Sequence, residues 1–546
     1  MGAFADGLAW LGLKERAPRV DPSGLVVWDR MDDEFRTVCA VWADGRCFIA
    51  EGYGADAHVR EMLGALRATG AVPARLRERI VPLERIAEAW GRGKGGGLLE
   101  LADPRTVERV FDGFTKVVEA EGDDLAIEVG TEDTRIKVCV NDRKIQIGKP
   151  VTVKEGELMI EHLMYGRDEG SGQTGTVRQS FQGFSATAKE LKLPGEIGAL
   201  RCERGPHAPG GQHLFARLLG GDRLKEGTTL QDLGFGDDVA EIFREIRMSQ
   251  YGGIFLGGST GDGKTTSIAT NLNLQMAEHD YELNLVTVED PVEIRIRGAI
   301  QIAVPTSGFG KKRSKHFQQA LMHFVRMHPA VGMVSEIRDR MGAQQVLQFI
   351  DSGHQIWTTI HVHSANGILF RLLDLGVKPS EVVKKGNVRL LMKQTLIGGL
   401  CASCCLDRPV GGKELPRGLM AVLGPEVRFR NPEGCRLCRK EGKSELWLDA
   451  WAGYGNGRRA VAEWIVPDDG YLEFVRRNKA IAAWHYWMDE LGGETLGTKL
   501  WKLVGAGAVD PFDALKKGAQ VAEAAPALGR PPPGPRLASD GGEPVG

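Results

Sequence analysis

The stretch GGSTGDGKTT, residues 257–266, decides the fold prediction for this chain of 546 residues. It directly follows the apolar run IFL and precedes SIATNLNLQMAEH, which is rich in helix-forming residues. Its spacing matches the phosphate-binding pattern G-x-x-x-x-G-K-[ST], in which the loop joins a strand to a helix. The glycines of such a loop let backbone N–H groups surround a phosphate at the N-terminus of the helix. The sequence therefore predicts a nucleotide-binding loop between a strand and a helix.

Two side chains of this loop carry the expected chemistry. Lys264 would neutralise the β and γ oxygens of the nucleotide, and the hydroxyl of Thr265 would take a position beside Mg²⁺. The alternative is a glycine-rich turn without a ligand, but the preceding strand and the following helix favour phosphate binding. The nucleotide is expected to contact nine consecutive residues, namely Gly258, Ser259, Thr260, Gly261, Asp262, Gly263, Lys264, Thr265 and Thr266.

Polar residues end three predicted strands downstream of the loop. LNLVTVEDPVE reaches Glu289, VGMVSEIRD reaches Glu336, and QIWTTIHVHSA reaches His361. From residue 236 to about 400, short apolar strands alternate with helical segments, which is typical of a parallel α/β sheet. Because ligands bind at the carboxyl ends of parallel strands, we expect these side chains to lie together beside the loop. Carboxylates there would hold Mg²⁺ through water and orient an attacking water.

In this order, the four motifs resemble those of the ATPases that drive type II secretion, type IV pili and type IV secretion. GGSTGDGKTT is similar to the Walker A box of that family, TVEDPVE to its Asp box, MHPAVGMVSEIRD to its Walker B box and GHQIWTTIHVHSA to its His box. The resemblance extends from roughly residue 100 to 515. It implies an α/β fold with a RecA-like P-loop NTPase core, preceded by an α+β (PAS-like) domain and carrying a zinc-binding insert and C-terminal helices.

The resemblance also implies roles for the residues at the strand ends. Glu289 is then the expected general base, Glu336 serves the Mg²⁺ shell, and His361 senses or positions the γ-phosphate. The family usually has two acids, a glycine and an asparagine at four positions where this chain differs, which are His328, Ala330, Ser335 and His363. The essential acids remain, so ATP hydrolysis is expected, and the departures leave a catalytically weak, ATP-binding scaffold as an alternative.

The segment GALRCERGPHAPGGQHLFARLL resembles the end of the family's N-terminal domain, from which arginines reach the nucleotide. Arg201 and Arg217 match the family pattern best, and Arg204 is a weaker third. A guanidinium against the γ-phosphate neutralises charge that spreads over its oxygens during transfer. The alternative for these residues is a solvated strand edge. Since the arginines lie upstream of the loop, we expect a hinge near residues 233–237 and closure of the upstream domain when nucleotide binds.

Four of the nine cysteines form two CxxC pairs that are separated by 30 residues. Each pair presents two thiolates to one metal, and two pairs complete a tetrahedral Zn²⁺ site with no open position. The predicted ligands are Cys401, Cys404, Cys435 and Cys438. The alternative is free or redox-active thiols. Secretion and pilus-extension ATPases carry a similar tetracysteine insert, whereas retraction-type motors generally lack it.

The remaining sequence suggests how the chain is organised. Strands are expected around a polar turn in residues 24–52, then helical periodicity to about residue 90 and the linker GRGKGGG at 91–97. The expected parts are an N-terminal accessory domain with a possible partner-docking role (1–95), an α+β domain (96–235), the RecA-like core (236–400), a tetracysteine zinc subdomain (401–460), a C-terminal helical region (461–519) and a disordered tail (520–546).

Composition narrows the function classes. The formal net charge is −2, so no global basic field points to nucleic acid, and KKRSK at 311–315 is expected in a solvated loop. We find no run of about 18 apolar residues and no export signal at the start of the chain.

The leading hypothesis is a cytoplasmic, Mg²⁺-dependent ATPase, peripheral to the inner membrane, that uses ATP, Mg²⁺ and Zn²⁺. It would form a homo-oligomeric ring, expected to be a hexamer, and push on an inner-membrane platform protein to assemble a pilus or pseudopilus or to serve type II secretion or conjugative type IV transfer. The alternative is a RecA-like motor that translocates nucleic acid, which the near-neutral charge disfavours.

Overall fold

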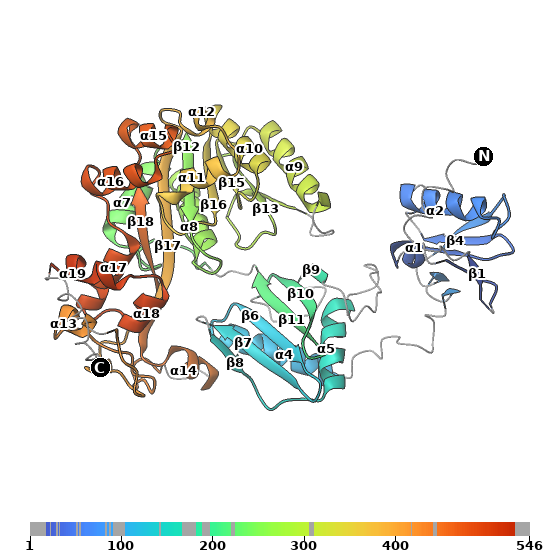
Figure 1. The fold of residues 1–546 in the computed structure, drawn as a ribbon, viewed down its shortest axis with the longest axis horizontal. Helices are drawn as coiled ribbons and strands as arrows, with labels where there is room; N and C mark the ends of the chain where they lie inside the picture. The colour runs from blue at the N-terminus through green and yellow to red at the C-terminus, as the bar shows by residue number, and fades with distance from the viewer. Residues whose placement is uncertain are drawn as a thin grey trace, which may run out of the picture.

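The computed structural model places three bodies along the chain, in the order in which Figure 1 colours them from blue to red. We refer to them as the N-terminal domain (18–90), the antiparallel-sheet domain (104–219) and the α/β domain (224–400 with 454–529); the cysteine segment (401–453) is inserted into the last. The described residues are 18–21, 23–28, 31, 33–50, 53, 56–81, 85–86, 89–90, 104–140, 143–165, 182–187, 197–219, 224–304, 311–416, 418–439 and 445–529.

The α/β domain is built on a seven-stranded sheet in the order β14-β13-β15-β16-β12-β17-β18. In its described part, all neighbouring strands run parallel except β17 and β18, which are antiparallel. The expected mixed α/β fold with a parallel sheet is therefore confirmed. The strands are β12 (Gly252–Gly257), β13 (Leu285–Glu289), β14 (Ile300–Ala303), β15 (Val331–Val334), β16 (Gln355–Ile360), β17 (Val388–Leu400) and β18 (Tyr454–Ile465).

Helices cover both faces of this sheet, so its central strands are buried on both sides. In β12, Ile254 and Leu256 pack with Trp357 in one hydrophobic cluster, whereas Phe255 lies in a second cluster with Ile356. Strands buried on both faces are continuous apolar runs, which explains the IFL run before the loop. The helices are α7 (Asp237–Arg247), α8 (Lys264–Glu278), α9 (Lys311–Arg326), α10 (Arg340–Asp351), α11 (Gly367–Asp374), α12 (Pro379–Val382), α15 (Asp469–Arg476), α16 (Ala480–Asp489), α17 (Leu496–Gly505), α18 (Pro511–Lys516) and α19 (Val521–Ala527).

The antiparallel-sheet domain has six strands in the order β8-β7-β6-β11-β10-β9, and α4 and α5 pack against β6 and β7. Its hydrophobic core also contains Trp447 and Trp451, which belong to the cysteine segment. A helix from the second half of the chain thus completes the core of a domain formed by the first half. The elements are α4 (Pro104–Glu119), β6 (Asp124–Val129), β7 (Thr134–Val140), β8 (Arg143–Gln146), α5 (Val153–Tyr165), β9 (Gln182–Thr187), β10 (Ala199–His207) and β11 (Gly211–Leu219).

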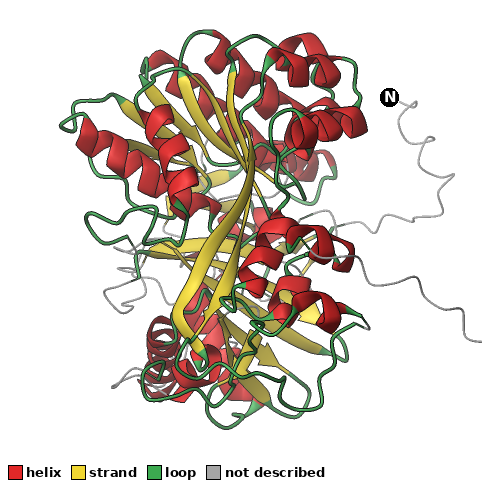
Figure 2. Cartoon of the chain, turned by 90° about the vertical axis from the view of Figure 1, so that its left-hand side faces the viewer, coloured by secondary structure: helices red, strands yellow, loops and turns green. Residues whose placement is uncertain are grey.

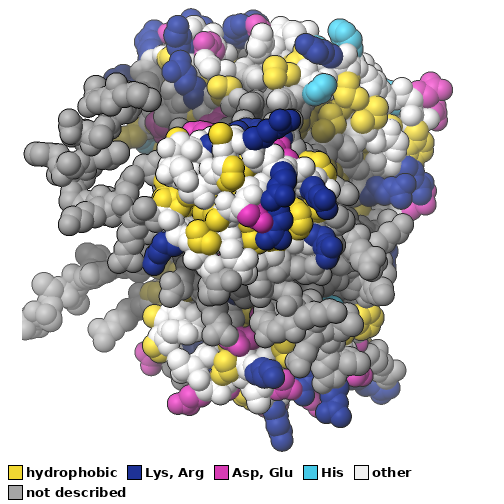
Figure 3. Space-filling model, turned by 90° about the vertical axis from the view of Figure 1, so that its right-hand side faces the viewer, with side chains coloured by type: hydrophobic (Ala, Val, Ile, Leu, Met, Phe, Trp, Pro, Cys, Tyr) yellow, Lys and Arg dark blue, Asp and Glu magenta, His cyan; other side chains and the backbone are white. Residues whose placement is uncertain are grey.

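The N-terminal domain has its own core and lies apart from the other bodies in Figure 1. Its last strand, β5, pairs in parallel with β4, so the expectation of continuous helical periodicity to residue 90 is wrong for Arg77–Val81. Figure 3 views the molecule from this side and shows several Lys and Arg side chains on the facing surface. The elements are β1 (Arg19–Val20), β2 (Val26–Val27), α1 (Asp33–Val38), β3 (Cys39–Val41), β4 (Arg46–Ala50), α2 (Ala57–Ala68) and β5 (Arg77–Val81). The linker expected at 91–97 lies outside the described residues.

Two long strands connect the α/β domain with the cysteine segment. Figure 2 shows β17 and β18 running as a pair from the large sheet into the lower part of the molecule, where the segment begins after Leu400. The segment contains α13 (Leu419–Leu423) and α14 (Glu445–Trp451). Because β18 spans residues 454–465 and belongs to the large sheet, the boundary expected between 460 and 461 falls inside a strand.

Three other expectations need correction. Residues 521–527 form α19 and pack against α17, so the tail expected to be disordered from residue 520 is helical at its start, and 530–546 lie outside the described residues. KKRSK belongs to the first turns of α9 and not to a loop. The hinge expected near 233–237 is part of the α/β domain, because Leu230 and Phe235 are buried in its core and Leu233 O accepts from Ala460 N at 2.8 Å.

Among the described residues, we find no helix with the length and apolar character needed to cross a membrane.

Candidate functional site

The loop between β12 and α8 wraps around the ammonium group of Lys264. Its Nζ donates to the carbonyl oxygens of Gly258 at 2.8 Å and Ser259 at 2.7 Å, and burial lowers the pKa of this lysine. Gly263 caps α8 with φ of 78°, a left-handed conformation that suits glycine. At Gly258, a Cβ atom would lie 2.8 Å from the carbonyl oxygen of Gln394. The loop therefore has the glycines that a close approach of its backbone to other groups requires.

Strand β17 holds the loop from behind through Asp262. Thr395 Oγ1 donates to Asp262 Oδ1 at 2.9 Å, and Gln394 Nε2 donates to the backbone oxygen of Asp262 at 2.7 Å. Oδ2 of Asp262 accepts from the backbone N–H of Ser259 at 2.6 Å. The sequence motif does not reveal this support, because Gln394 and Thr395 lie more than 130 residues downstream of the loop.

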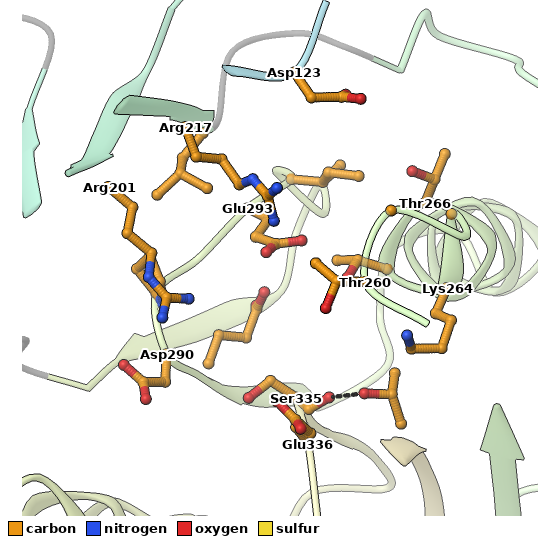
Figure 4. A pocket seen from close by; sticks show the side chains of 18 of the residues that line it. Asp123, Arg201, Arg217, Thr260, Lys264, Thr266, Asp290, Glu293, Ser335 and Glu336 are labelled. Atoms are coloured by element: carbon orange, nitrogen blue, oxygen red, sulfur yellow. Dashed lines mark hydrogen bonds between the residues drawn. The ribbon is translucent and has the colours of Figure 1, made fainter. Parts of the chain in front are cut away.

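The predicted strand-end residues do meet beside the loop. β13, β15 and β16 are neighbours in the sheet and run parallel, so they place Glu289, Glu336 and His361 at one edge. All three line a cavity of about 730 Å³ together with the loop, which is within the usual range for small-molecule sites. Figure 4 shows this cavity, with Lys264 and Glu336 labelled.

Glu289 is an almost completely buried acid at the end of β13, with 1% of its surface exposed. Its Oε1 accepts from Thr287 Oγ1 at 2.7 Å and from Gln301 Nε2 at 2.9 Å. Burial outweighs these hydrogen bonds and raises the pKa of Glu289 above its ordinary value of 4.5. A carboxylate held rigidly and made more basic is suited to accept a proton.

His361 joins the loop to Glu336. Its Nδ1 lies 3.1 Å from the carbonyl oxygen of Gly258, and its Nε2 lies 3.0 Å from Glu336 Oε1. Since a carbonyl oxygen only accepts, Nδ1 carries a proton in this arrangement. Arg338 Nε donates to the other oxygen of Glu336 at 2.9 Å. His363, the other histidine after β16, is not among the residues that line the cavity.

Two arginines of the antiparallel-sheet domain reach the opposite wall of the cavity. Arg201 in β10 and Arg217 in β11 are direct cross-strand partners, and both line the cavity. Figure 4 shows both guanidinium groups entering it from the side opposite Glu336. Arg204 does not line it: this side chain is buried, and its Nε and Nη2 donate to Gln212 Oε1 at 3.1 and 2.8 Å. The structure therefore separates Arg204 from the other two arginines.

The loop residues divide into two groups by position. Six of the nine predicted nucleotide contacts line the cavity, namely Thr260, Gly261, Gly263, Lys264, Thr265 and Thr266. The other three, Gly258, Ser259 and Asp262, make the internal contacts described above. His328 and Ala330, two of the departures from the family pattern, precede β15, at the end opposite Glu336, and do not line the cavity.

Sequence reasoning missed several charged residues of the cavity. Asp123, Asp124 and Arg458 also line it, and they come from the start of β6 and from β18. Arg217 donates to both carboxylate oxygens of Asp124, through Nε at 2.7 Å and Nη2 at 3.1 Å. An acid before an apolar strand could have suggested a functional residue at position 124, but the pairing depends on strand register.

The tetracysteine cluster forms a second site. Ligand atoms of Cys401, Cys404, Cys435 and Cys438 all lie within 4.8 Å of one another. Sγ atoms are 3.8 Å apart in the Cys401–Cys435 pair and 3.7 Å apart in the Cys404–Cys438 pair. Zn–S bonds of about 2.3 Å in tetrahedral geometry require S–S distances of about 3.8 Å. The backbone N–H groups of Cys435 and Gly453 point at Cys438 Sγ, at 3.1 and 3.4 Å. The donor set therefore fits zinc.

Comparisons with known proteins agree on one family. A family model described as "Type II/IV secretion system protein" matches residues 103–514. The type IV pilus assembly ATPase PilB of Pseudomonas aeruginosa is 31% identical over 244 residues, which cover 44% of this chain and 40% of that protein. The type II secretion system protein E of Xanthomonas campestris pv. campestris is 36% identical over 290 residues, covering 53% of this chain and 46% of that protein.

The chain thus spans less than half the length of these two relatives. Among solved structures, the ATPase DotB of Legionella pneumophila aligns with a TM-score of 0.49 and 14% identity, covering 78% of this chain and 96% of that one.

Proposed function

The chain belongs to the family of type II/IV secretion system proteins, and we propose that it is an ATPase that powers such a machine. The observation that carries the proposal is one cavity that joins the Lys264 loop, the buried acid Glu289, and the two arginines of another domain. ATP is the proposed substrate, with its phosphates on the loop and its γ-phosphate between Glu289 and the arginines. The fold of the α/β domain is proposed to be RecA-like, and that of the antiparallel-sheet domain to be PAS-like.

Each residue would perform one task in phosphoryl transfer. Lys264 would leave its two carbonyl partners and bind the β and γ oxygens, because a phosphate is the stronger acceptor. Glu289 would take a proton from the attacking water, since burial raises its pKa. His361 would lie beside the γ-phosphate, positioned by its contacts with Gly258 and Glu336. Arg201 and Arg217 would neutralise the charge that develops on the transferring group.

Mg²⁺ would be held by Thr265 and, through water, by Glu336. When bound, this ion would neutralise charge on the β and γ oxygens. Zn²⁺ would be held by the tetracysteine cluster, which has no open position and would therefore serve structure and not catalysis.

The larger assembly is also part of the proposal. We expect a homo-oligomeric ring, with a hexamer as the expected number, located in the cytoplasm and peripheral to the inner membrane. Its partner would be a platform protein of a pilus or secretion machine, and the N-terminal domain is the expected docking part.

ATP turnover by the purified full chain tests the proposed activity. Lys264→Ala should reduce turnover at least about 100-fold, because it removes the charge on the β/γ oxygens. Lys225→Ala is the matched control, since Lys225 is exposed and lies outside the cavity. Equal turnover in both variants, or no ATP turnover by the unaltered chain with Mg²⁺ present, would contradict the proposal.

A further inference from the structure

The Asp124 carboxylate accepts two hydrogen bonds from one edge of the Arg217 guanidinium. The two residues are direct partners on the neighbouring strands β6 and β11, and both carboxylate oxygens accept from Arg217, at 2.7 and 3.1 Å. This hydrogen bonding raises the pKa of Arg217. The donors used are Nε and Nη2. Within the described residues, Nη1 makes no hydrogen bond to protein, so the Nη1 edge of the guanidinium can bind a phosphate.

These hydrogen bonds matter because a second arginine, Arg201, lies directly opposite Arg217 on the neighbouring strand. The strand register puts Arg201, Arg217 and Asp124 in one row across β10, β11 and β6. Like charges at directly opposed positions repel each other and destabilise the pairing. Among the described residues, the acid paired with Arg201 is Glu203 at 3.8 Å, and that carboxylate is half exposed. Within this row, Asp124 is the acid opposite the two guanidinium groups, and its two hydrogen bonds hold the Nε edge of Arg217.

The turn that carries Asp124 is fixed by the distant part of the chain. Trp451 Nε1 donates to the carbonyl oxygen of Ala120 at 2.8 Å, and Arg458 pairs with Asp123 at 3.4 Å. Trp451 and its neighbour Trp447 are each 2% exposed within the core of the antiparallel-sheet domain. Since Arg458 lies on β18 of the large sheet, these contacts set the position of the turn relative to the sheet that carries the Lys264 loop.

We propose that Asp124 is a positioning residue that aims Arg217 at the transferring phosphate, and that Trp451 and Arg458 hold its turn in place. The proposal rests on the function proposed above. Judged by its charge alone, Asp124 would be expected to repel the negatively charged ATP, whereas this proposal gives it a role in catalysis by positioning Arg217. An inhibitory role, in which Asp124 competes with phosphate for Arg217, is the opposite reading, and the experiment decides between them.

The test compares Asp124→Asn with Asp133→Asn in the full chain. Asp133 is a matched control, because it pairs with the exposed Arg135 in the same domain and lies outside the cavity. Asp124→Asn should lower kcat about tenfold and change KM for ATP less than about twofold, since the orientation of the Arg217 guanidinium matters mainly in the transition state. Asp124→Glu, which keeps a carboxylate, should restore part of kcat. In an Arg217→Ala background, Asp124→Asn should have no further effect.

A second variant covers the case in which Asp124→Asn does not fold. Trp451→Phe keeps an aromatic ring in the core but removes the N–H that holds Ala120, and Trp451 does not line the cavity. It should lower kcat at unchanged KM and leave the affinity for a fluorescent ATP analogue as it was. Unchanged or raised kcat in the folded variants, or an Asp124→Asn effect that adds fully to Arg217→Ala, would overturn the proposal. Turnover by the unaltered chain and by Lys264→Ala reports separately on the proposed function.

Discussion

Replacement of one cysteine of the cluster should show whether zinc holds the cysteine segment together. Cys435→Ser removes one of four ligands whose sulfur atoms already lie at the spacing of a tetrahedral zinc site. The metal cross-links residues that are far apart in sequence, because Cys404 and Cys435 close a loop of about 32 residues. The Cys435→Ser chain lacks this cross-link, so the metal no longer constrains the loop in the folded protein.

The size of the effect follows from that loop. A covalent cross-link that closes a loop of about 32 residues contributes about 4 kcal/mol at 25 °C, and a structural zinc site, whose binding free energy is also folding free energy, contributes at least about this much. A change of about 1 kcal/mol shifts Tm by about 2–4 °C in domains of 150–250 residues. We therefore expect the unfolding transition that includes the cysteine segment to fall by about 10 °C.

The assay is thermal unfolding of the full chain with the metal content measured on the same samples. Unaltered protein should contain about one zinc ion per chain by the four-thiolate argument, and a strong chelator should reproduce the loss in Tm seen with Cys435→Ser. Cys405→Ser is the matched control, because Cys405 is the adjacent thiol and lies outside the cluster, and the described contact of its Sγ is with the carbonyl oxygen of Ala402 at 3.8 Å.

Three results would refute the reasoning. They are a metal-free chain purified in the presence of zinc, equal Tm values for the two serine variants, and a transition that falls with a reductant instead of a chelator. The last result would indicate a disulfide, which needs an S–S distance near 2.05 Å and therefore a movement of the thiols from their present 3.8 Å.

Two further predictions concern Glu289. Glu289→Gln should lower kcat at least about 100-fold while ATP binding, measured with a fluorescent analogue, is kept, as for a residue that acts mainly in the transition state; loss of binding at an unchanged rate per bound nucleotide would contradict this. The acid limb of kcat should lie above pH 4.5, because burial raises the pKa of Glu289 and only its ionised form accepts a proton, so turnover rises with pH through this pKa. An acid limb that persists unchanged in Glu289→Gln would assign the titration to another group.

The sequence predicted the central sheet and one side of the cavity well, because their signals are local. A buried parallel strand, a glycine-rich loop and a helix follow one another between residues 252 and 278, and each has a characteristic composition. The three polar strand ends could be assigned to one edge since parallel strands share their direction. On the other wall, the resemblance pointed to Arg201 and Arg217. Asp124 could not be predicted, because the register of β6 and β11 that sets it beside Arg217 leaves no trace in either segment.

The errors have physical causes as well. β5 carries three charged residues and only two β-branched ones, and it is a strand because β4 offers a parallel partner. α19 consists mainly of small residues, yet Ala524 and Ala525 are buried against neighbouring helices. The hinge was expected from the order of the domains, but Gly234 in that range packs closely on β18, since a Cβ there would come within 2.7 Å of the Arg459 Cα.

The contacts of α14 limit how the antiparallel-sheet domain can move when ATP binds. Undocking this helix would expose Trp447 and Trp451, which at about 200 Å² each and about 25 cal/mol per Å² costs about 10 kcal/mol. Binding of ATP with micromolar affinity supplies only about 8 kcal/mol. We therefore expect α14 to stay docked and any closure to carry it along with the domain. Hydrogen exchange of residues 445–451 should then be the same with and without nucleotide, whereas the loop at 258–266 should become protected. Faster exchange in α14 on ATP binding would show that the helix releases the domain, and the arginines would then reach the phosphate by a larger swing than this structure allows.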